Sequence, residues 1–243
     1  LHYPLRRQRQ MCIRDRFLLG EARSDVFGGT PFGGEATQGM ERFPYNTLNA
    51  ENPGISGFGD LYQNINQMNL FISRTLHTDV LTESAKNYYL GQVYGLRAYY
   101  MYQLYRSWGD AVFTEEPSLG FEVGKLAKAA TPAAEIFEQV KKDIESSLSY
   151  FGPDYTIKEK KSLWSKAATL MLKADVYLWS AHRDGGEGDA RTAKNALVDI
   201  QNNISRSNLD LMDTYQGVFA YDNKGNNCLL YTSPSPRDGA TSR

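Results

Sequence analysis

The side chains that most often carry catalysis are few in this chain and form no familiar arrangement. Outside the first and last sixteen residues the only histidines are His77 and His182, which are far apart, and no His-Glu-x-x-His pair occurs. No Gly-x-Ser-x-Gly turn presents a nucleophile, and the glycines between positions 28 and 39 lack the Lys-Ser/Thr ending of a phosphate-binding loop. The sequence therefore predicts no catalytic set, no metal site and no cofactor.

Paired carboxylates leave one route to an enzyme open. Glu21 lies close in sequence to Asp25, and Glu115 is next to Glu116. Two carboxyl groups that flank a glycosidic bond can act as the acid and the base or nucleophile of its hydrolysis. An all-helical glycosidase is therefore one alternative. The acidic turn 184–189 lacks the alternating oxygen ligands of an EF-hand loop and does not predict a calcium site of that kind.

Aromatic residues in the segment 17–59 suggest binding of a ligand. Rings displayed on an ordered loop can stack on the apolar faces of sugar rings, while neighbouring polar side chains hydrogen-bond the hydroxyl groups. Packing of the same rings onto the helices is the alternative for each of them. The candidate ligand-binding residues are Phe43, Tyr45 and Phe58, with Arg42, Asn46 and Asp25 as polar partners.

A second group of aromatic residues lies in the segment 82–108. Seven of the sixteen tyrosines occur there and cover more than one face of the expected helix. This pattern indicates a helix between neighbours, with its rings in the core and its hydroxyl groups at the edge. The seven are Tyr88, Tyr89, Tyr94, Tyr99, Tyr100, Tyr102 and Tyr105.

The two ends of the chain share one inverted DNA sequence when they are written as codons. Met11–Arg16 can be encoded by ATG-TGT-ATA-AGA-GAC-AGN, and Cys228–Thr232 by TGT-CTC-TTA-TAC-ACA, which is its reverse complement over nearly the whole length. The string resembles the transposase adapter of sequencing libraries. We expect residues 1–16 and 228–243 to be translated adapter. A disordered basic head and a Ser/Pro tail are the alternative.

Composition excludes several broad classes. The 243 residues are 41% hydrophobic and 23% charged, which is typical of a globular chain. No apolar run is long enough for a membrane helix, and the net charge of −1 gives no basic field for nucleic acid. Residues 17–227 alone carry 20 basic and 26 acidic residues, a net charge of −6, and no cysteine. Disulfides, zinc ribbons and thiol nucleophiles are therefore not expected.

We expect residues 17–59 to form a long loop rich in Gly and aromatic residues. Beyond this loop the sequence shows helical periodicity. An apolar stripe with helical spacing, ending at Leu76, predicts a helix over 58–76. Thr82 is the expected N-cap of a longer helix that ends at Trp108, before Gly109. Small residues on one side of that helix would let a neighbouring helix approach closely. They are Gly91, Gly95 and Ala98.

Three further helices are expected in the second half. Thr131 is the predicted N-cap of a helix with Pro132 at its first position, ended by Gly152-Pro153. A fourth helix is expected over 162–182, a polar turn over 184–189, and a fifth helix over 193–204. Helices in series with short connections indicate an all-α fold of stacked helical hairpins. It resembles a tetratricopeptide array in outline, but no 34-residue period recurs.

Six segments of the chain form a pattern in their order and spacing. They are Gly20-Glu21-Ala22-x-Ser24-Asp25, Leu61-Tyr62-x-x-Ile65-x-x-x-Asn69, Leu96–Tyr100 with Trp108-Gly109-Asp110, Ile136-Phe137-x-x-Val140-x-x-Asp143-Ile144, Lys166–Ala168 to Tyr177-Leu178, and Leu209-x-Leu211-x-x-x-Tyr215-x-x-x-Phe219. Together they resemble the SusD/RagB family of outer-membrane nutrient-binding lipoproteins. The resemblance covers residues 17–227, and such proteins are about twice as long, so we expect this to be the N-terminal part.

The resemblance implies a SusD-type helical scaffold without enzymatic activity. It implies capture of oligosaccharides or other nutrients at the cell surface and their delivery to a SusC-like TonB-dependent transporter. It also implies an outer-membrane location through an N-terminal lipid anchor that these residues do not include. A helical protein-interaction scaffold with no small-molecule site is the alternative beside the glycosidase.

Overall fold

A computed structural model of the chain describes residues 59–120, 128–158 and 163–219, together with Asn49, Glu51 and Lys161. The chain divides into two compact units, residues 1–64 and 65–243. Almost all of the expected loop 17–59 and both expected adapter segments lie outside the described residues. The described part contains helices and no β-strand, which confirms the all-α class. None of its helices is both long and apolar enough to cross a membrane.

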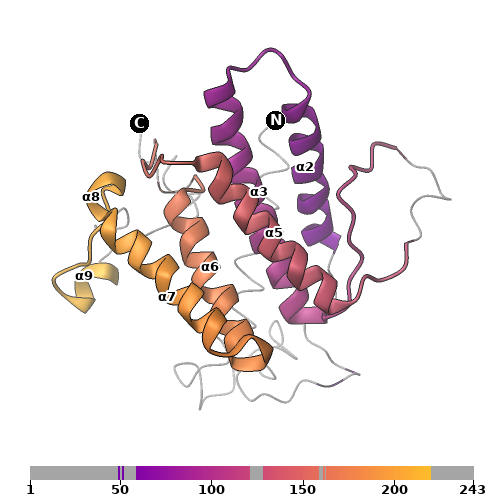
Figure 1. Ribbon diagram of the computed structural model, residues 1–243. Coiled ribbons are helices and arrows are strands. Elements are labelled where there is room, and N and C mark those ends of the chain that lie inside the picture. The colour runs from indigo at the N-terminus through magenta and orange to yellow at the C-terminus, as the bar shows by residue number, and fades with distance from the viewer. Residues whose placement is uncertain are drawn as a thin grey trace, which may run out of the picture. The chain divides into compact units, whose positions relative to one another are not determined.

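The first described helices form a hairpin. Helix α2 covers Gly59–Leu76 and helix α3 covers Glu83–Trp108, as the apolar spacing predicted. The two lie side by side (Figure 1), and the Phe71 and Tyr89 rings meet edge to face at 6.2 Å. The Thr82 hydroxyl accepts a hydrogen bond from the Ala85 backbone N–H, and Gly109 follows the last turn with φ at 74°. Both predicted ends of α3 are therefore confirmed.

Helix α5, Ala133–Phe151, begins one residue later than the sequence predicted. Its N-cap is Pro132, which has no side-chain donor or acceptor, so the predicted Thr131 cap is wrong. Instead, the Asp110 carboxylate accepts a hydrogen bond of 2.8 Å from the Ala133 backbone N–H. A carboxylate placed there also complements the helix dipole. The predicted stop at Gly152 is confirmed, with φ at 52°.

The last two long helices differ from the predicted bounds. Helix α6 covers Lys166–Ser180 and starts at the Ser165 cap rather than near residue 162. A π-helical turn, Ala181–Gly185, leads directly into helix α7, Gly186–Asn202. The predicted polar turn 184–189 therefore lies within helical structure. The chain changes direction at Gly186, whose φ is 55°. Short helices α8, Ile204–Ser207, and α9, Tyr215–Phe219, follow.

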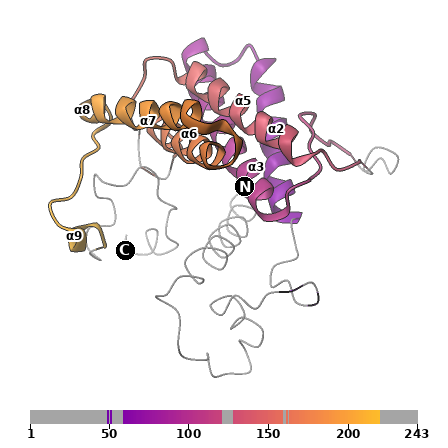
Figure 2. The ribbon, with the colours of Figure 1, turned by 60° about the horizontal axis from the view of Figure 1, so that its bottom comes forward.

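Helix α3 packs against α5 and α6, while α6 and α7 lie side by side (Figures 1 and 2). Of the seven tyrosines of α3 only Tyr89 is exposed, which agrees with the predicted placement of the rings in the core. The hydroxyl of the fully buried Tyr102 is not at the edge and has no hydrogen-bond partner in the described residues, contrary to the prediction. The small residues allow the close approach that was predicted. The Phe151 ring lies against Gly91, and the Trp164 indole and Thr169 hydroxyl lie against Gly95.

A separate core cluster joins α6 and α7 through Tyr155, which lies in the connection between α5 and α6. Its hydroxyl donates a hydrogen bond of 2.6 Å to the Asp199 carboxylate. The Lys166 ammonium lies 3.8 Å from the centre of the ring, and the Arg206 guanidinium lies 4.9 Å from it. Tyr155 therefore fixes the α5–α6 connection to α7.

We expect Gly95→Ala to destabilise the chain although alanine favours helices. A Cβ at position 95 would collide with the Trp164 indole, and overpacking of this kind costs about 1–3 kcal/mol. Gly188→Ala is the matched control, because a Cβ there meets nothing within 4 Å and should stabilise α7 by up to about 1 kcal/mol. Urea unfolding followed by circular dichroism measures both; equal effects of the two substitutions would contradict the packing account.

We expect Tyr155→Phe to destabilise the chain by about 1.5–3 kcal/mol at pH 7, because its hydroxyl bonds a charged acceptor. Burial, together with the hydrogen bond to Asp199, raises the pKa of Tyr155 from 10.0 to about 12. A raised acid pKa means that this stabilisation is complete below pH 10 and disappears as the pH rises through 12. Urea unfolding of both proteins at pH 7, 9 and 11 should therefore show a difference that shrinks only at pH 11.

Candidate functional site

A buried ion pair joins α3 to α5. The Arg97 Nε donates to Asp143 Oδ2, and the Arg97 Nη2 donates to Asp143 Oδ1, both at 2.7 Å. The side chains are only 3% and 1% exposed. Two parallel charge-assisted hydrogen bonds are the strongest arrangement that a guanidinium and a carboxylate can make. The pair therefore fixes the position of one helix along the other.

Polar groups from two other segments complete the hydrogen bonding of this pair. The Arg97 Nη1 donates to Asn69 Oδ1 at 2.9 Å, and the Asn69 Nδ2 donates to the Thr114 backbone oxygen at 2.6 Å. On the α5 side, the Gln139 Nε2 donates to Asp143 Oδ1 at 3.0 Å. Buried charges are tolerated when their remaining hydrogen-bonding capacity is met in this way. Helices α2, α3 and α5 and the loop after α3 therefore share one network.

The two charges of the network support each other. Burial raises the pKa of the Asp143 carboxyl, and the hydrogen bonds from Arg97 and Gln139 oppose that rise. Burial would lower the pKa of Arg97, but the hydrogen bond to Asp143 and its charge outweigh burial and raise this pKa. A guanidinium so stabilised stays charged at every physiological pH. Asp143 is consequently held by a permanent cation that occupies both of its oxygens.

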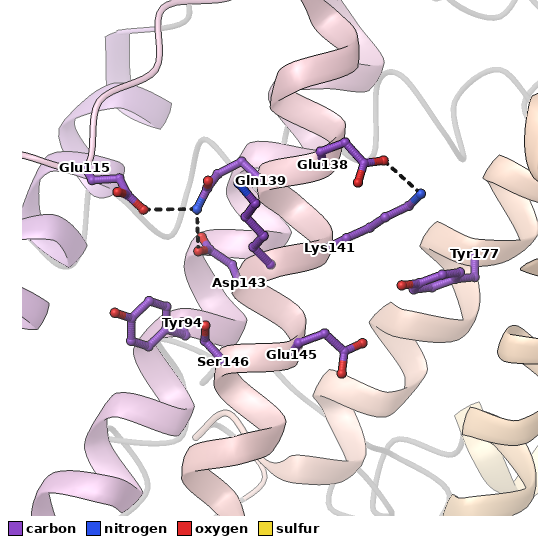
Figure 3. Close-up of a pocket in the computed structure, with 10 residues that line it drawn as sticks. Tyr94, Glu115, Glu138, Gln139, Lys141, Asp143, Glu145, Ser146 and Tyr177 are labelled. Carbon is purple, nitrogen blue, oxygen red and sulfur yellow. Dashed lines mark hydrogen bonds and ion pairs between the residues drawn. The ribbon is translucent and has the colours of Figure 1, made fainter.

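An open hollow of about 510 Å³ lies beside the network, between α3, α5 and α6 (Figure 3). Figure 3 shows Gln139 between Glu115 and Asp143, and its Nε2 donates to Glu115 Oε1 at 3.1 Å. Tyr94 and Tyr177 lie at two sides of the hollow. The Tyr94 ring stacks on Tyr150 at 5.5 Å, with the Arg97 guanidinium 5.1 Å from its centre.

Most of the charges around the hollow are already paired. Lys141 lies 3.0 Å from Glu138, and Lys173 lies 2.6 Å from Glu145, in addition to the Arg97–Asp143 pair. No group of three or more metal-ligating side chains occurs in the described ranges. The hollow can therefore offer hydrogen bonds to a polar molecule, but its paired carboxylates are poorly suited to acid–base chemistry.

The six predicted ligand-binding residues, Asp25, Arg42, Phe43, Tyr45, Asn46 and Phe58, lie outside the described residues, as does Glu21. Their role remains a prediction. Of the second carboxylate pair, Glu115 lies 3.6 Å from Arg97 Nη2, and both Glu115 and Glu116 are exposed. His77 and His182 are also exposed, and the ring of His77 contacts the Ser73 backbone oxygen at 2.6 Å.

The sequence analysis did not anticipate the network, although one signal for it was present. Arg97 lies among small and aromatic residues of α3, and Asp143 interrupts the apolar stripe of α5 between Val140 and Ile144. A charge on the buried side of a helix requires a partner. Opposite charges on two buried helix faces therefore suggested a pair, but their separation by 46 residues hid the contact.

The described part is thus an all-helical scaffold of stacked hairpins, pinned by a buried polar network. Among solved structures it is similar to a SusD superfamily protein from Bacteroides vulgatus, with 45% identity and a TM-score of 0.78 over 90% of this chain and 44% of that one. It is also similar to NanU of B. fragilis, with 46% identity and a TM-score of 0.83 over 97% of this chain and 47% of that one.

A curated relative agrees with these structures. SusD-like protein P25 of Formosa agariphila is 24% identical over 179 residues, which are 74% of this chain and 32% of that protein. No family model matches the chain. These similarities support membership of the SusD/RagB family, which the six segments predicted. It spans less than half the length of these relatives.

We expect a double-mutant cycle to show strong coupling in the buried pair. Arg97→Met alone or Asp143→Leu alone leaves an unpaired buried charge and should cost about 3–5 kcal/mol, whereas the double variant should cost clearly less than the sum. The exposed α7 pair Glu187–Arg191 is the control, with an expected coupling of at most about 0.5 kcal/mol. Additive single effects at Arg97 and Asp143, measured by urea unfolding, would refute the network's role.

Proposed function

We propose that this chain is part of a non-enzymatic binding protein that captures glycans or other nutrients and delivers them to a TonB-dependent outer-membrane transporter. The observation that carries the proposal is 45–46% identity to two Bacteroides proteins of the SusD type across nearly the whole chain. The proposal includes a SusC-like transporter as the partner and a surface location through a lipid anchor.

Two more distant neighbours support a glycan as the ligand class. One is described as a laminarin-binding SusD-like protein, with 21% identity and a TM-score of 0.64. The other was solved with a xylogluco-oligosaccharide, with 21% identity and a TM-score of 0.65. At this identity they share the fold with our chain, and their ligands indicate which class of compound to test first.

The residues proposed to contact the ligand are those of the Gly-rich and aromatic segment. The described helices support this choice indirectly, because the rings beside the hollow already have neighbours. Tyr94 is stacked on Tyr150, and the Lys141 and Lys173 ammonium groups lie 5.4 and 5.8 Å from the centre of the Tyr177 ring. Phe43, Tyr45 and Phe58 are therefore the proposed stacking surfaces, with Asp25, Arg42 and Asn46 as hydrogen-bonding partners.

We expect the triple variant Phe43→Ala, Tyr45→Ala, Phe58→Ala to lose at least about tenfold in glycan retention, because each lost ring contact contributes about 0.5–1.5 kcal/mol. Affinity electrophoresis against laminarin, xyloglucan and a broader glycan panel measures the retention. Phe71→Ala is the control, since Phe71 is an exposed phenylalanine of α2.

Two outcomes would change the proposal. Retention that is equal in the triple variant and in the parent chain would favour an interaction scaffold without a sugar site. Release of reducing sugar that is abolished by Glu21→Gln or Asp25→Asn would instead establish a glycosidase. A coding region for a SusC-like transporter next to this one would support the delivery step, and its absence from the complete genomic neighbourhood would count against it.

A further inference from the structure

The long connection between α3 and α5, residues 109–132, is closed at its base. The Ala111 and Thr131 backbones pair as an isolated β-bridge, with N···O distances of 3.2 and 2.9 Å. Next to this bridge, the Asp110 carboxylate caps α5. Connections of this length are uncommon in compact domains and are usually functional. We call residues 111–118, the branch that leaves this base, the strap.

Two asparagines of α2 hold the strap. The Ser118 N–H donates to Asn66 Oδ1 at 2.7 Å, and the Asn66 Nδ2 donates to the Ser118 backbone oxygen at 3.2 Å. One amide side chain therefore bonds both backbone groups of Ser118, as a neighbouring β-strand would. Asn69 is three positions further on the same face of α2, and its Nδ2 donates to the Thr114 backbone oxygen at 2.6 Å. Helix α2 thus holds the strap at two points.

The strap also forms the outer layer of the buried network. The Thr114 backbone oxygen is the acceptor for Asn69, whose Oδ1 accepts from Arg97. The Glu115 carboxylate accepts from the Gln139 Nε2 at 3.1 Å. Asn69 and Arg97 are buried, whereas the Glu115 side chain is 64% exposed. The closed strap therefore completes on the outside the hydrogen bonding that the helices begin in the core.

One side of the hollow beside α5 belongs to the strap. Of the described residues that line this hollow, Glu115 is the one that does not lie on a helix. Figure 3 shows Glu115 on the loop, joined to Gln139. The Gln139 Nε2 donates to both Glu115 and Asp143. Movement of the strap would therefore release Gln139 from Glu115 and open the hollow on that side.

The strap is held more weakly than the helices. Of its residues only Ala111 is buried, and the two hydrogen bonds between Asn66 and Ser118 are exposed. Segments with few buried apolar contacts and exposed hydrogen bonds open at a lower free energy than a packed core. Helices α3 and α5, by contrast, are joined by the buried ion pair and by packed apolar side chains. The strap can therefore open while the helices stay packed.

We propose that the strap is a movable side wall of the hollow, which Asn66 latches shut and which opens as one unit while the helices stay packed. Opening exposes the Gln139 amide and the hollow to solvent, and closure returns that amide to Glu115. Asn66 is a positioning residue, since it bonds the strap and does not line the hollow. This opening goes beyond the proposed function and occurs whichever nutrient the protein captures.

Amide hydrogen exchange of the full chain, followed residue by residue by NMR, tests the latch. In the parent chain the amides of Ala111, Ser118 and Thr131 should exchange faster than the core amide of Ile144. In the Asn66→Ala variant the three should exchange at least about tenfold faster again, because the strap loses two hydrogen bonds to α2. Exchange at Ile144 should be unchanged.

Two further variants separate a latch from a general loss of packing. Asn195→Ala removes an exposed asparagine of α7 and should change none of these rates. Asn66→Asp keeps an acceptor for the Ser118 N–H but loses the donor, so its exchange rates should lie between those of the parent chain and of Asn66→Ala. Circular dichroism checks the fold of each variant, and Asn66→Asp carries the same test if Asn66→Ala does not fold.

Three outcomes would overturn the proposal. Unchanged exchange at the β-bridge in the Asn66→Ala variant would show that the strap does not open as one unit. Acceleration at Ile144 equal to that at Ser118 would show that the helices open with the strap. An unshifted resonance of the Gln139 side-chain amide in the variant would show that this wall of the hollow does not move.

Discussion

The hydrogen-bonded ion pair between Arg97 and Asp143 is the constraint on which the rest of the described structure depends. Removing two charges from water costs several kcal/mol for each ion, and only close pairing with further hydrogen bonds offsets that cost. Asn69 and Gln139 supply those bonds from two other elements. A shift of α5 along α3 by one turn would leave both charges buried and unpaired. The pair therefore selects one register among many that apolar packing alone would allow.

Close approach of the helices is the second requirement, and the small residues of α3 meet it. Without a side chain at Gly91, the Ser147 hydroxyl reaches the Gly91 backbone oxygen at 2.6 Å and also contacts the Thr169 hydroxyl at 2.9 Å. The Trp164 indole nitrogen donates to the same Thr169 oxygen at 2.8 Å. These polar contacts link α3, α5 and α6 within the core. The ion pair and the small residues thus act together, since neither set of contacts forms unless the helices are close.

Sequence reasoning located the helices whose ends carry strong local signals. Thr82, Gly109 and Gly152 act within a few residues, so the bounds of α3 and the end of α5 followed from spacing and capping alone. The α5 cap was wrong because its acceptor, Asp110, lies 23 residues away. The passage from α6 to α7 was also wrong, because a π-helical turn and a glycine with positive φ have no distinct periodicity. Pairing of Arg97 with Asp143 is tertiary, so the sequence analysis did not predict it, although each of the two charges lies on an otherwise apolar helix face.

The paired charges of the described residues belong to the scaffold. Around the hollow beside α5, acidic and basic side chains largely neutralise each other, and the rings rest against neighbouring side chains. A ligand there would have to compete with contacts that the fold already uses. Selectivity for a ligand depends on groups whose bonding capacity is still free, because only those groups gain interaction energy when it binds. The helical core therefore uses most of its polar groups for its own packing, and a ligand gains most from side chains that the core network leaves free.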